Sequence, residues 1–202
     1  EVRAGGIYID CTLGGGGHTR RILDSGGSVI GIDRDRTAIE YANRLLSDAG
    51  DRFTAVLARF SEIKSVAGHH AGAIDGIVMD LGVSSNMIDD PSKGFSFRKD
   101  GPLLMDMGLS GMTALDIVNS SSARELTTIF RTYGEEVKAR AIAAAIVKAR
   151  LSYPIRTTSD LASIVETVSG PHMAGKSKAR VFQALRIKVN DELGELRRGL
   201  DG

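Results

Sequence analysis

The segment Ile7–Leu23 reads IYIDCTLGGGGHTRRIL and contains four consecutive glycines, Gly14 to Gly17. An apolar run precedes the glycines and a helix-forming run follows them, so the segment predicts a strand, a glycine turn and a helix. Glycine adopts positive φ without strain and lets backbone N–H groups approach a ligand, and the start of the helix adds unpaired donors. The segment therefore predicts a small-molecule site that accepts an anionic group.

The spacing of the glycines narrows the choice of ligand. A dinucleotide-binding turn follows the pattern G-x-G-x-x-G, and Thr19 stands where the third glycine would fall, which disfavours NAD. A second apolar run, 28–32, ends at Asp33, and an acidic residue about twenty positions beyond the turn accepts hydrogen bonds from a ribose diol. S-adenosylmethionine fits both features, because its carboxylate can meet the turn and its ribose can meet Asp33. The alternative is a glycine-rich turn with a surface aspartate.

The first 85 residues alternate between strand and helix patterns. We expect strands near 7–11, 28–33, 53–58 and 75–81, and helices near 18–24 and 37–48. This alternation predicts an α/β fold with a parallel sheet and helices on its faces. The last of these strands places Asp80 at the carboxyl edge of the sheet, where ligands bind in such folds.

The pattern changes after Ser85. Residues 86–111 are rich in turn formers and predict an ordered loop, whose Phe95 and Phe97, beside Arg98 and Lys99, could stack on a base and hold its phosphates. The alternative is that both rings anchor the loop to the core. Residues 113–168 predict a helical insert, and 178–200 predict one helix with an apolar stripe. Gln183, Arg186 and Asn190 share a face of that helix, where polar groups usually satisfy neighbouring backbone.

The composition is that of an ordinary globular chain of one domain, or of one domain with an insertion. The 202 residues carry a net charge of +1, from 26 basic and 25 acidic side chains. Residues 131–188 hold eleven Lys or Arg against four acids, an excess of seven that suits either a nucleic acid or a solvated helical surface. Cys11 is the only cysteine, so no intramolecular disulfide forms, and we expect a small buried residue. No apolar run reaches the length of a membrane helix.

In these features, the chain resembles the ribosomal RNA small-subunit methyltransferase H family, also called MraW. The resemblance covers almost the whole chain in order. The matching stretches are 6–10, 14–18, 31–35, 59–62, 75–85, 93–103, 131–136 and 180–187.

The resemblance implies a Rossmann-like class I methyltransferase sheet with an inserted helical subdomain, and S-adenosylmethionine as the cofactor. It implies a methyltransferase core formed by 1–85 and 178–202, and an RNA-recognition subdomain at 86–177. The implied cofactor contacts are Gly14, Gly16, Gly17, His18, Asp33, Phe60 and Asp80, with Phe60 near the adenine and Asp80 also catalytic. The implied RNA contacts are Phe95, Phe97, Arg98, Lys99 and Arg186.

The family methylates the exocyclic amino nitrogen, N4, of a cytosine in small-subunit ribosomal RNA. The resemblance therefore implies this rRNA as a partner, together with ribosomal proteins or assembly factors, and neither a metal nor a membrane. The family carries a bulkier residue in place of Gly15, Gln in place of Met87, and Asp-Met-Arg-Met in place of residues 104–107. The last two departures raise the alternative of an inactive ribosome-assembly factor, and a third option is methylation of a protein or a metabolite.

Two further expectations follow from the resemblance. The family continues beyond the Gln183 helix into further strands, so we expect the sheet to be incomplete on its carboxyl-terminal side. The departures from the common motifs favour the mitochondrial matrix over the bacterial cytoplasm as the location.

Overall fold

The computed structural model describes residues 1–201, apart from the side chains of residues 85 and 86. The chain divides into two compact units. A sheet unit contains residues 1–84 and the segment from Leu193 onward, and a helical unit contains residues 85–192. Strands are β1 Ile7–Asp10, β2 Ser28–Asp33, β3 Phe53–Leu57 and β4 Ile74–Val78. Helices of the sheet unit are α1 Gly17–Asp24, α2 Arg36–Leu45, η1 Ser47–Arg52, η2 Phe60–Glu62, α3 Ile63–Ala67, η3 Gly68–His70 and, from its second residue onward, α10 Glu192–Asp201. Those of the helical unit are α4 Ser85–Asp89, η4 Pro91–Lys93, α5 Ala114–Ser120, α6 Ala123–Gly134, α7 Ala139–Ala149, α8 Thr158–Ser169 and α9 Ala174–Asn190.

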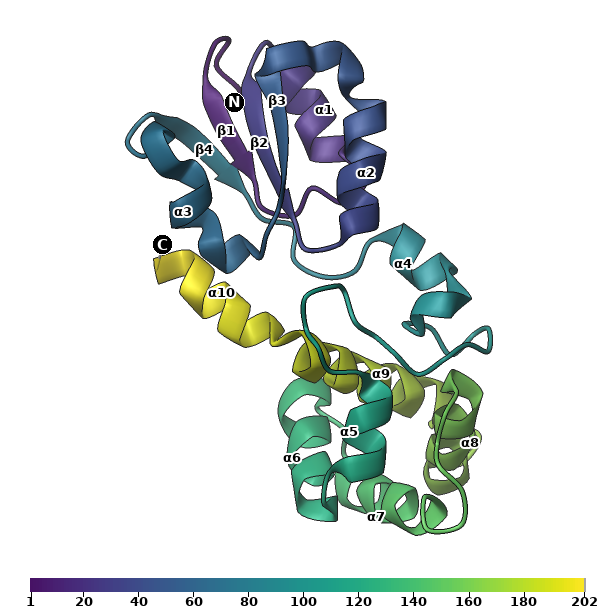
Figure 1. The fold of residues 1–202 in the computed structure, drawn as a ribbon. Helices are drawn as coiled ribbons and strands as arrows, with labels where there is room; N and C mark the ends of the chain where they lie inside the picture. The colour runs from purple at the N-terminus through teal and green to yellow at the C-terminus, as the bar shows by residue number, and fades with distance from the viewer. Residues whose placement is uncertain (202) are drawn as a thin grey trace. The chain divides into compact units, whose positions relative to one another are not determined.

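In the sheet unit, β1 to β4 form a parallel sheet in the order β3-β2-β1-β4. Adjacent residues of a strand point to opposite faces, and β1 shows this directly. Tyr8 packs in the cluster beneath α1 and α2, whereas Ile9 packs in the cluster beneath α3 (Figure 1). Helices cover both faces of the sheet at β1 and β2, whose residues are mostly buried, as the inner strands of a parallel sheet require. The edge strand β4 is more open, and its Ile77 is 52% exposed. The predicted α/β fold and its parallel sheet are confirmed.

The central position of β1 places its last residue in the middle of the sheet edge. Asp10 pairs with Gly31 of β2 on one side and with Val78 of β4 on the other. On β2 the pairing with β3 ends at Asp33, opposite Leu57. The carboxyl ends of these parallel strands therefore converge on one edge, where the glycine turn also begins.

The helical unit is an insert between the two segments of the sheet unit, as expected. Its core gathers side chains of α5 to α9 around Phe130, which is fully buried. Three of its helices begin with a reciprocal cap: Thr113 with Asp116, Ser122 with Glu125, and Thr157 with Asp160. Each cap satisfies backbone donors at a helix start and fixes where the helix begins.

The carboxyl-terminal boundary differs from the prediction. The sequence predicted one helix over 178–200, but α9 ends at Asn190, and Asp191 has a left-handed φ of 48° before α10 begins. In the structure, α9 packs on α6 and α8, and residues 178–192 fall in the helical unit. The domain division implied by the resemblance, which groups 178–202 with the methyltransferase core, stays a prediction. Asp tolerates the left-handed conformation better than most residues, and the apolar stripe continues across the break, so the pattern alone gave no sign of it.

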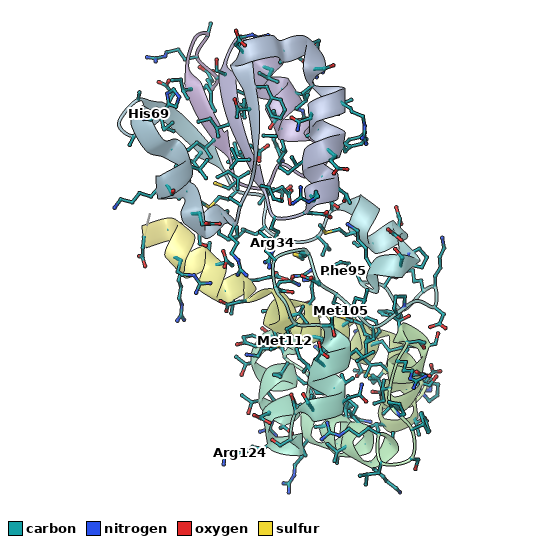
Figure 2. All side chains as sticks on the ribbon, viewed as in Figure 1. Arg34, His69, Phe95, Met105, Met112 and Arg124 are labelled. Carbon is teal, nitrogen blue, oxygen red and sulfur yellow. The ribbon has the colours of Figure 1, made fainter. Side chains whose placement is uncertain are left out.

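The side chain of Asn190, the last residue of α9, binds the loop that precedes α5. Its Nδ2 donates to the Met105 carbonyl at 2.8 Å, and its Oδ1 accepts from the Met107 N–H at 2.9 Å. Figure 2 labels Met105 and Phe95 on the segment between η4 and α5. Asn190 is therefore a buried support for this loop, as the interpretation of polar groups on that helix face predicted. Within residues 1–201, no helix is both long and apolar enough to span a bilayer.

Candidate functional site

The candidate site lies at the carboxyl edge of the sheet unit. Asp10 ends β1, Asp33 ends β2, and Asp80 follows two residues after β4 ends at Val78. Ligands of open parallel sheets bind at this edge, where loops leave the strands and helix starts face the same side. The residues of this edge, from Asp10 to Asp80, belong to the sheet unit.

The glycine turn between β1 and α1 has the conformation that the sequence predicted. Gly14 and Gly16 have φ values of +46° and +75°, which disfavour residues with a Cβ. The turn is held at both ends, since Leu13 N–H donates to the Ile32 carbonyl at 3.0 Å and Gly16 N–H donates to the Leu13 carbonyl at 2.7 Å. A Cβ built at Gly15 or Gly17 would meet no atom within 4 Å. The turn therefore leaves open space beside its backbone.

Asp33 connects the second strand to this turn. Its Oδ2 accepts a hydrogen bond from Gly14 N–H at 2.8 Å, and its Oδ1 accepts one from Asp35 N–H at 2.8 Å. Burial raises the pKa of the Asp33 carboxyl above its usual range, and the hydrogen bonds from Asp35 and Gly14 only partly oppose this. Each carboxylate oxygen has a second lone-pair direction, so Asp33 keeps the capacity to accept from a ligand hydroxyl.

Asp10 organises the other side of the turn, a role that the sequence analysis missed. Its carboxylate is fully buried and accepts from Thr12 N–H at 3.1 Å and from the Thr19 hydroxyl at 2.7 Å. An acidic residue at the end of an apolar central strand was the available signal, because a buried carboxylate needs partners. Burial, followed by the nearby Asp10 charge, raises the pKa of the Cys11 thiol to about 12. This fits the expected small buried residue rather than a nucleophile.

Asp80 and His18 come together at the open side of the turn. Asp80 Oδ2 lies 3.4 Å from His18 Nε2, and the two side chains are 73% and 48% exposed. The backbone N–H of Asp80 donates to the Thr12 hydroxyl oxygen at 2.8 Å. Two side chains predicted from separate motifs are therefore neighbours. In the part of the chain that the structure describes, no three His, Cys, Asp or Glu side chains are grouped so as to hold a metal ion.

Phe60 follows β3 and packs against α10. A Cβ built at Gly199 would lie 2.7 Å from Cδ2 of Phe60, so α10 approaches the ring closely at this glycine. The same helix is fixed by Glu195, which is 2% exposed and accepts from Arg59 Nη1 at 3.0 Å and Arg198 Nη2 at 2.9 Å. The contact of Phe60 with an adenine stays a prediction. Sequence patterns could not show the contact with α10, because more than 130 residues separate the partners.

Acid is expected to loosen α10. Burial would raise the pKa of Glu195, but hydrogen bonds from Ser61, Arg59 and Arg198 outweigh it and lower the pKa from 4.5 to about 2. A carboxyl whose pKa is lower in the folded state stabilises that state fully above 4.5 and loses the contribution as the pH falls towards 2. Amide hydrogen exchange in α10, corrected for its intrinsic rate, should therefore accelerate between about pH 4.5 and 2.

The matched variants for this test are Glu195→Gln and Glu40→Gln, the second at an exposed position of the same unit. Glu195→Gln should loosen α10 already at neutral pH and flatten the pH dependence, whereas Glu40→Gln should behave as the parent. Unchanged protection of α10 down to pH 2.5 in the parent would contradict the role given to Glu195.

In the helical unit, the residues proposed to contact RNA lie in different environments. Phe95 and Phe97 pack against the core, and the Phe97 ring meets Phe182 edge to face with centroids 5.3 Å apart. The anchoring interpretation of these two rings therefore has support, and their contact with RNA stays a prediction. Arg186 forms a two-point ion pair with Glu192, with N–O distances of 2.7 and 3.0 Å, so its charge is already compensated. Arg98 and Lys99 are exposed, and their contact with RNA stays a prediction.

Comparison with known proteins gives a consistent result. The model of the MraW methylase family matches residues 1–202. Ribosomal RNA small subunit methyltransferase H of Afipia carboxidovorans is 52% identical over 201 residues, which cover 98% of this chain and 60% of that protein. Proteins of the same name from Rhodopseudomonas palustris strain TIE-1 and Parvibaculum lavamentivorans are 50% and 47% identical, over 98% and 100% of this chain and 61% of each relative.

The chain thus spans about 60% of the length of the curated relatives that it matches. The glycine turn, the acidic strand ends and the inserted helical unit lie within the matched region. The match extends over every residue of the chain, far beyond a shared nucleotide-binding turn. The chain belongs to the MraW methylase family.

Proposed function

We propose that the protein transfers a methyl group from S-adenosylmethionine to N4 of a cytosine in small-subunit ribosomal RNA. The observation that carries the proposal is that the glycine turn, Asp33 and Asp80 meet at one edge of the sheet. There, Gly14 N–H binds Asp33 Oδ2 at 2.8 Å, and Asp80 lies beside His18 at the other side of the same turn. The family of the chain and the names of its relatives supply the reaction type and the substrate class.

The residues at this edge fit S-adenosylmethionine. The space beside Gly15 and Gly17 suits a close approach of the methionine end to the backbone, where His18 adds a polar side chain. The Asp33 carboxylate accepts backbone hydrogen bonds and can also accept from a ribose hydroxyl, and Phe60 offers an apolar ring for the adenine. When bound, S-adenosylmethionine supplies a methyl group made electrophilic by its sulfonium.

The chain's own contribution to the reaction is orientation and proton handling. The lone pair of a cytosine amino group is conjugated with the ring, which makes the nitrogen a poor nucleophile. An exposed Asp80 carboxylate can accept hydrogen bonds from this amino group and take up the proton that it loses. Alignment of the two reactants accounts for a further part of the rate, up to about 7–11 kcal/mol in favourable cases.

The proposed partner is small-subunit rRNA with its target base unstacked, as chemistry on a base requires. Ribosomal proteins or assembly factors are proposed as further partners. The relatives compared here are bacterial, so they do not support the expected mitochondrial location. We propose the bacterial cytoplasm, the alternative considered from the sequence.

No specific observation favours the alternative of an inactive assembly factor. Its motivation was the departure from the family pattern at Met87, Leu104 and Asp106. Met87 is buried, and Asp106 accepts hydrogen bonds from Gly108 N–H at 2.8 Å and from the Ser110 hydroxyl. Met87 and Asp106 therefore have local structural roles within the helical unit.

The test is transfer of labelled methyl from S-adenosylmethionine to small-subunit rRNA by the purified full-length protein. We expect label in the rRNA, and nuclease digestion with mass spectrometry should identify N4-methylcytidine. Calorimetry with S-adenosylmethionine alone distinguishes the enzyme from the inactive assembly factor, because a scaffold without cofactor affinity would give no heat of binding. Label on a different atom or base would refute the proposed specificity.

A further inference from the structure

The backbone around Asp80 is tied to the sheet by a side chain rather than by a strand pair. The pairing of β1 with β4 ends at Asp10 and Val78, and the last backbone bond runs from Cys11 N–H to the Val78 carbonyl at 2.9 Å. Beyond this point, the segments that follow β1 and β4 are no longer paired through their backbones. The next link is the 2.8 Å hydrogen bond from Asp80 N–H to Thr12 Oγ1.

The Asp80 side chain has little else to hold it. It is 73% exposed, and its contact with His18 is a 3.4 Å approach between two exposed groups. Such a contact contributes little to order, because both groups stay solvated and mobile. The direction in which Asp80 points therefore depends on how firmly its backbone is fixed.

Thr12 is itself fixed from the interior of the sheet. Its N–H donates to Asp10 Oδ1 at 3.1 Å, and the second oxygen of the buried Asp10 carboxylate accepts from the buried Thr19 hydroxyl at 2.7 Å. A continuous chain of hydrogen bonds thus leads from the buried end of β1, through Thr12, to the backbone of Asp80. The glycine turn lies between Thr12 and Thr19, so the same chain sets both sides of the candidate site.

We infer that Thr12 is a positioning residue for methyl transfer, which aligns Asp80 through its backbone N–H. The inference rests on the proposed function of Asp80. Thr12 acts without touching substrate or cofactor, and its hydroxyl oxygen is the atom required. Misplacement of a reacting group by about 1 Å can lower a rate on the order of 100-fold, so loss of this hydrogen bond should be visible in kcat.

The matched variants are Thr12→Val, which keeps the shape and removes the acceptor, and Thr12→Ser, which keeps the acceptor. In the full-length protein, Thr12→Val should lower kcat by about 10- to 100-fold and change the KM for S-adenosylmethionine by less than about threefold. Thr12→Ser should stay within about threefold of the parent. A large rise in the KM for S-adenosylmethionine with unchanged kcat would overturn the inference, because Thr12 would then stabilise only the glycine turn and would not position Asp80.

A double-substitution cycle with Asp80→Asn tests whether Thr12 acts through Asp80. We expect Thr12→Val to have little further effect once Asp80 has lost its charge. An equal loss in both backgrounds would overturn the inference while leaving the role of Asp80 intact. If Asp80→Asn keeps full activity, the catalytic role of Asp80 fails, and the inference fails with it. If Asp80→Asn is inactive and Thr12→Val is fully active, the inference about Thr12 is overturned and the proposed role of Asp80 stands.

Hydrogen exchange gives a readout that does not depend on turnover. The Asp80 amide should exchange faster in Thr12→Val and return to the parent rate in Thr12→Ser, with thermal unfolding of all three proteins closely similar. Equal protection of the Asp80 amide in Thr12→Val and the parent would show that the hydrogen bond does not fix the backbone, and this would overturn the inference.

Discussion

Replacement of Asp80 by asparagine is expected to lower kcat for methyl transfer by about 10²- to 10⁴-fold, the usual contribution of a positioned proton acceptor. The side chain keeps its shape and loses the charge that, in the proposed function, accepts a proton from the cytosine amino group. Asp80 is 73% exposed and its backbone hydrogen bond to Thr12 is unaffected by the change. The free energy of unfolding should therefore stay within about 0.5 kcal/mol of the parent.

The measurement is single-turnover transfer of labelled methyl to small-subunit rRNA, with urea unfolding as the stability check. Asp24→Asn is the matched control, because this exposed side chain lies at the far end of α1 and its ion pair with Arg20 is a distant 3.9 Å. The control should keep parental kcat. Full activity of Asp80→Asn, or an equal loss in Asp24→Asn, would remove Asp80 from the mechanism.

Substitution of a glycine by alanine should have opposite effects at two helical positions of the helical unit. At Gly134, the end of α6, a Cβ would lie 2.3 Å from the Arg180 carbonyl oxygen and 3.1 Å from Cβ of Ala184, both on α9. Neither backbone nor a buried alanine can move away alone, so Gly134→Ala should destabilise by about 1–3 kcal/mol or more, the range for overpacking. The helical unit should then unfold at lower urea.

Gly175→Ala is the comparison. Gly175 lies within α9, and a Cβ there would meet no atom within 4 Å. Alanine restricts the unfolded chain more than glycine does, so this change should stabilise by about 0.4–1 kcal/mol. Urea unfolding followed by circular dichroism gives both values. Equal effects of the two substitutions would show that α6 and α9 do not meet as closely as Gly134 indicates.

The parts of the fold that depend on local sequence were predicted well. The strand, the glycine turn and the following helix at the amino terminus lie within one or two residues of their predicted bounds, because apolar periodicity and glycine act over a few positions. The same holds for the placement of Asp33 at a strand end. His18 and Asp80 were expected at one site, and the structure brings them to 3.4 Å.

The features that were missed depend on contacts between distant residues. No local pattern shows that Phe182 packs on Phe97 or that Thr12 accepts from the Asp80 backbone. The break at Asp191 was missed because the apolar stripe continues across it, although Asn190 and Asp191 are weak helix formers. Tertiary packing decided these cases over local preference.

The docking of α10 onto Phe60 and Arg59 sets an order of assembly. Arg59 and Glu195 stand 136 positions apart, so this contact closes a long loop that includes the whole helical unit. During translation the strands and α1 to α3 emerge first, and α10 emerges only after the whole helical insert has been made. Contacts of such high contact order form late, because the entropy of closing the loop is lost before the contact is gained. Until synthesis has passed Gly199, the sheet unit therefore lacks the helix that packs against the Phe60 ring.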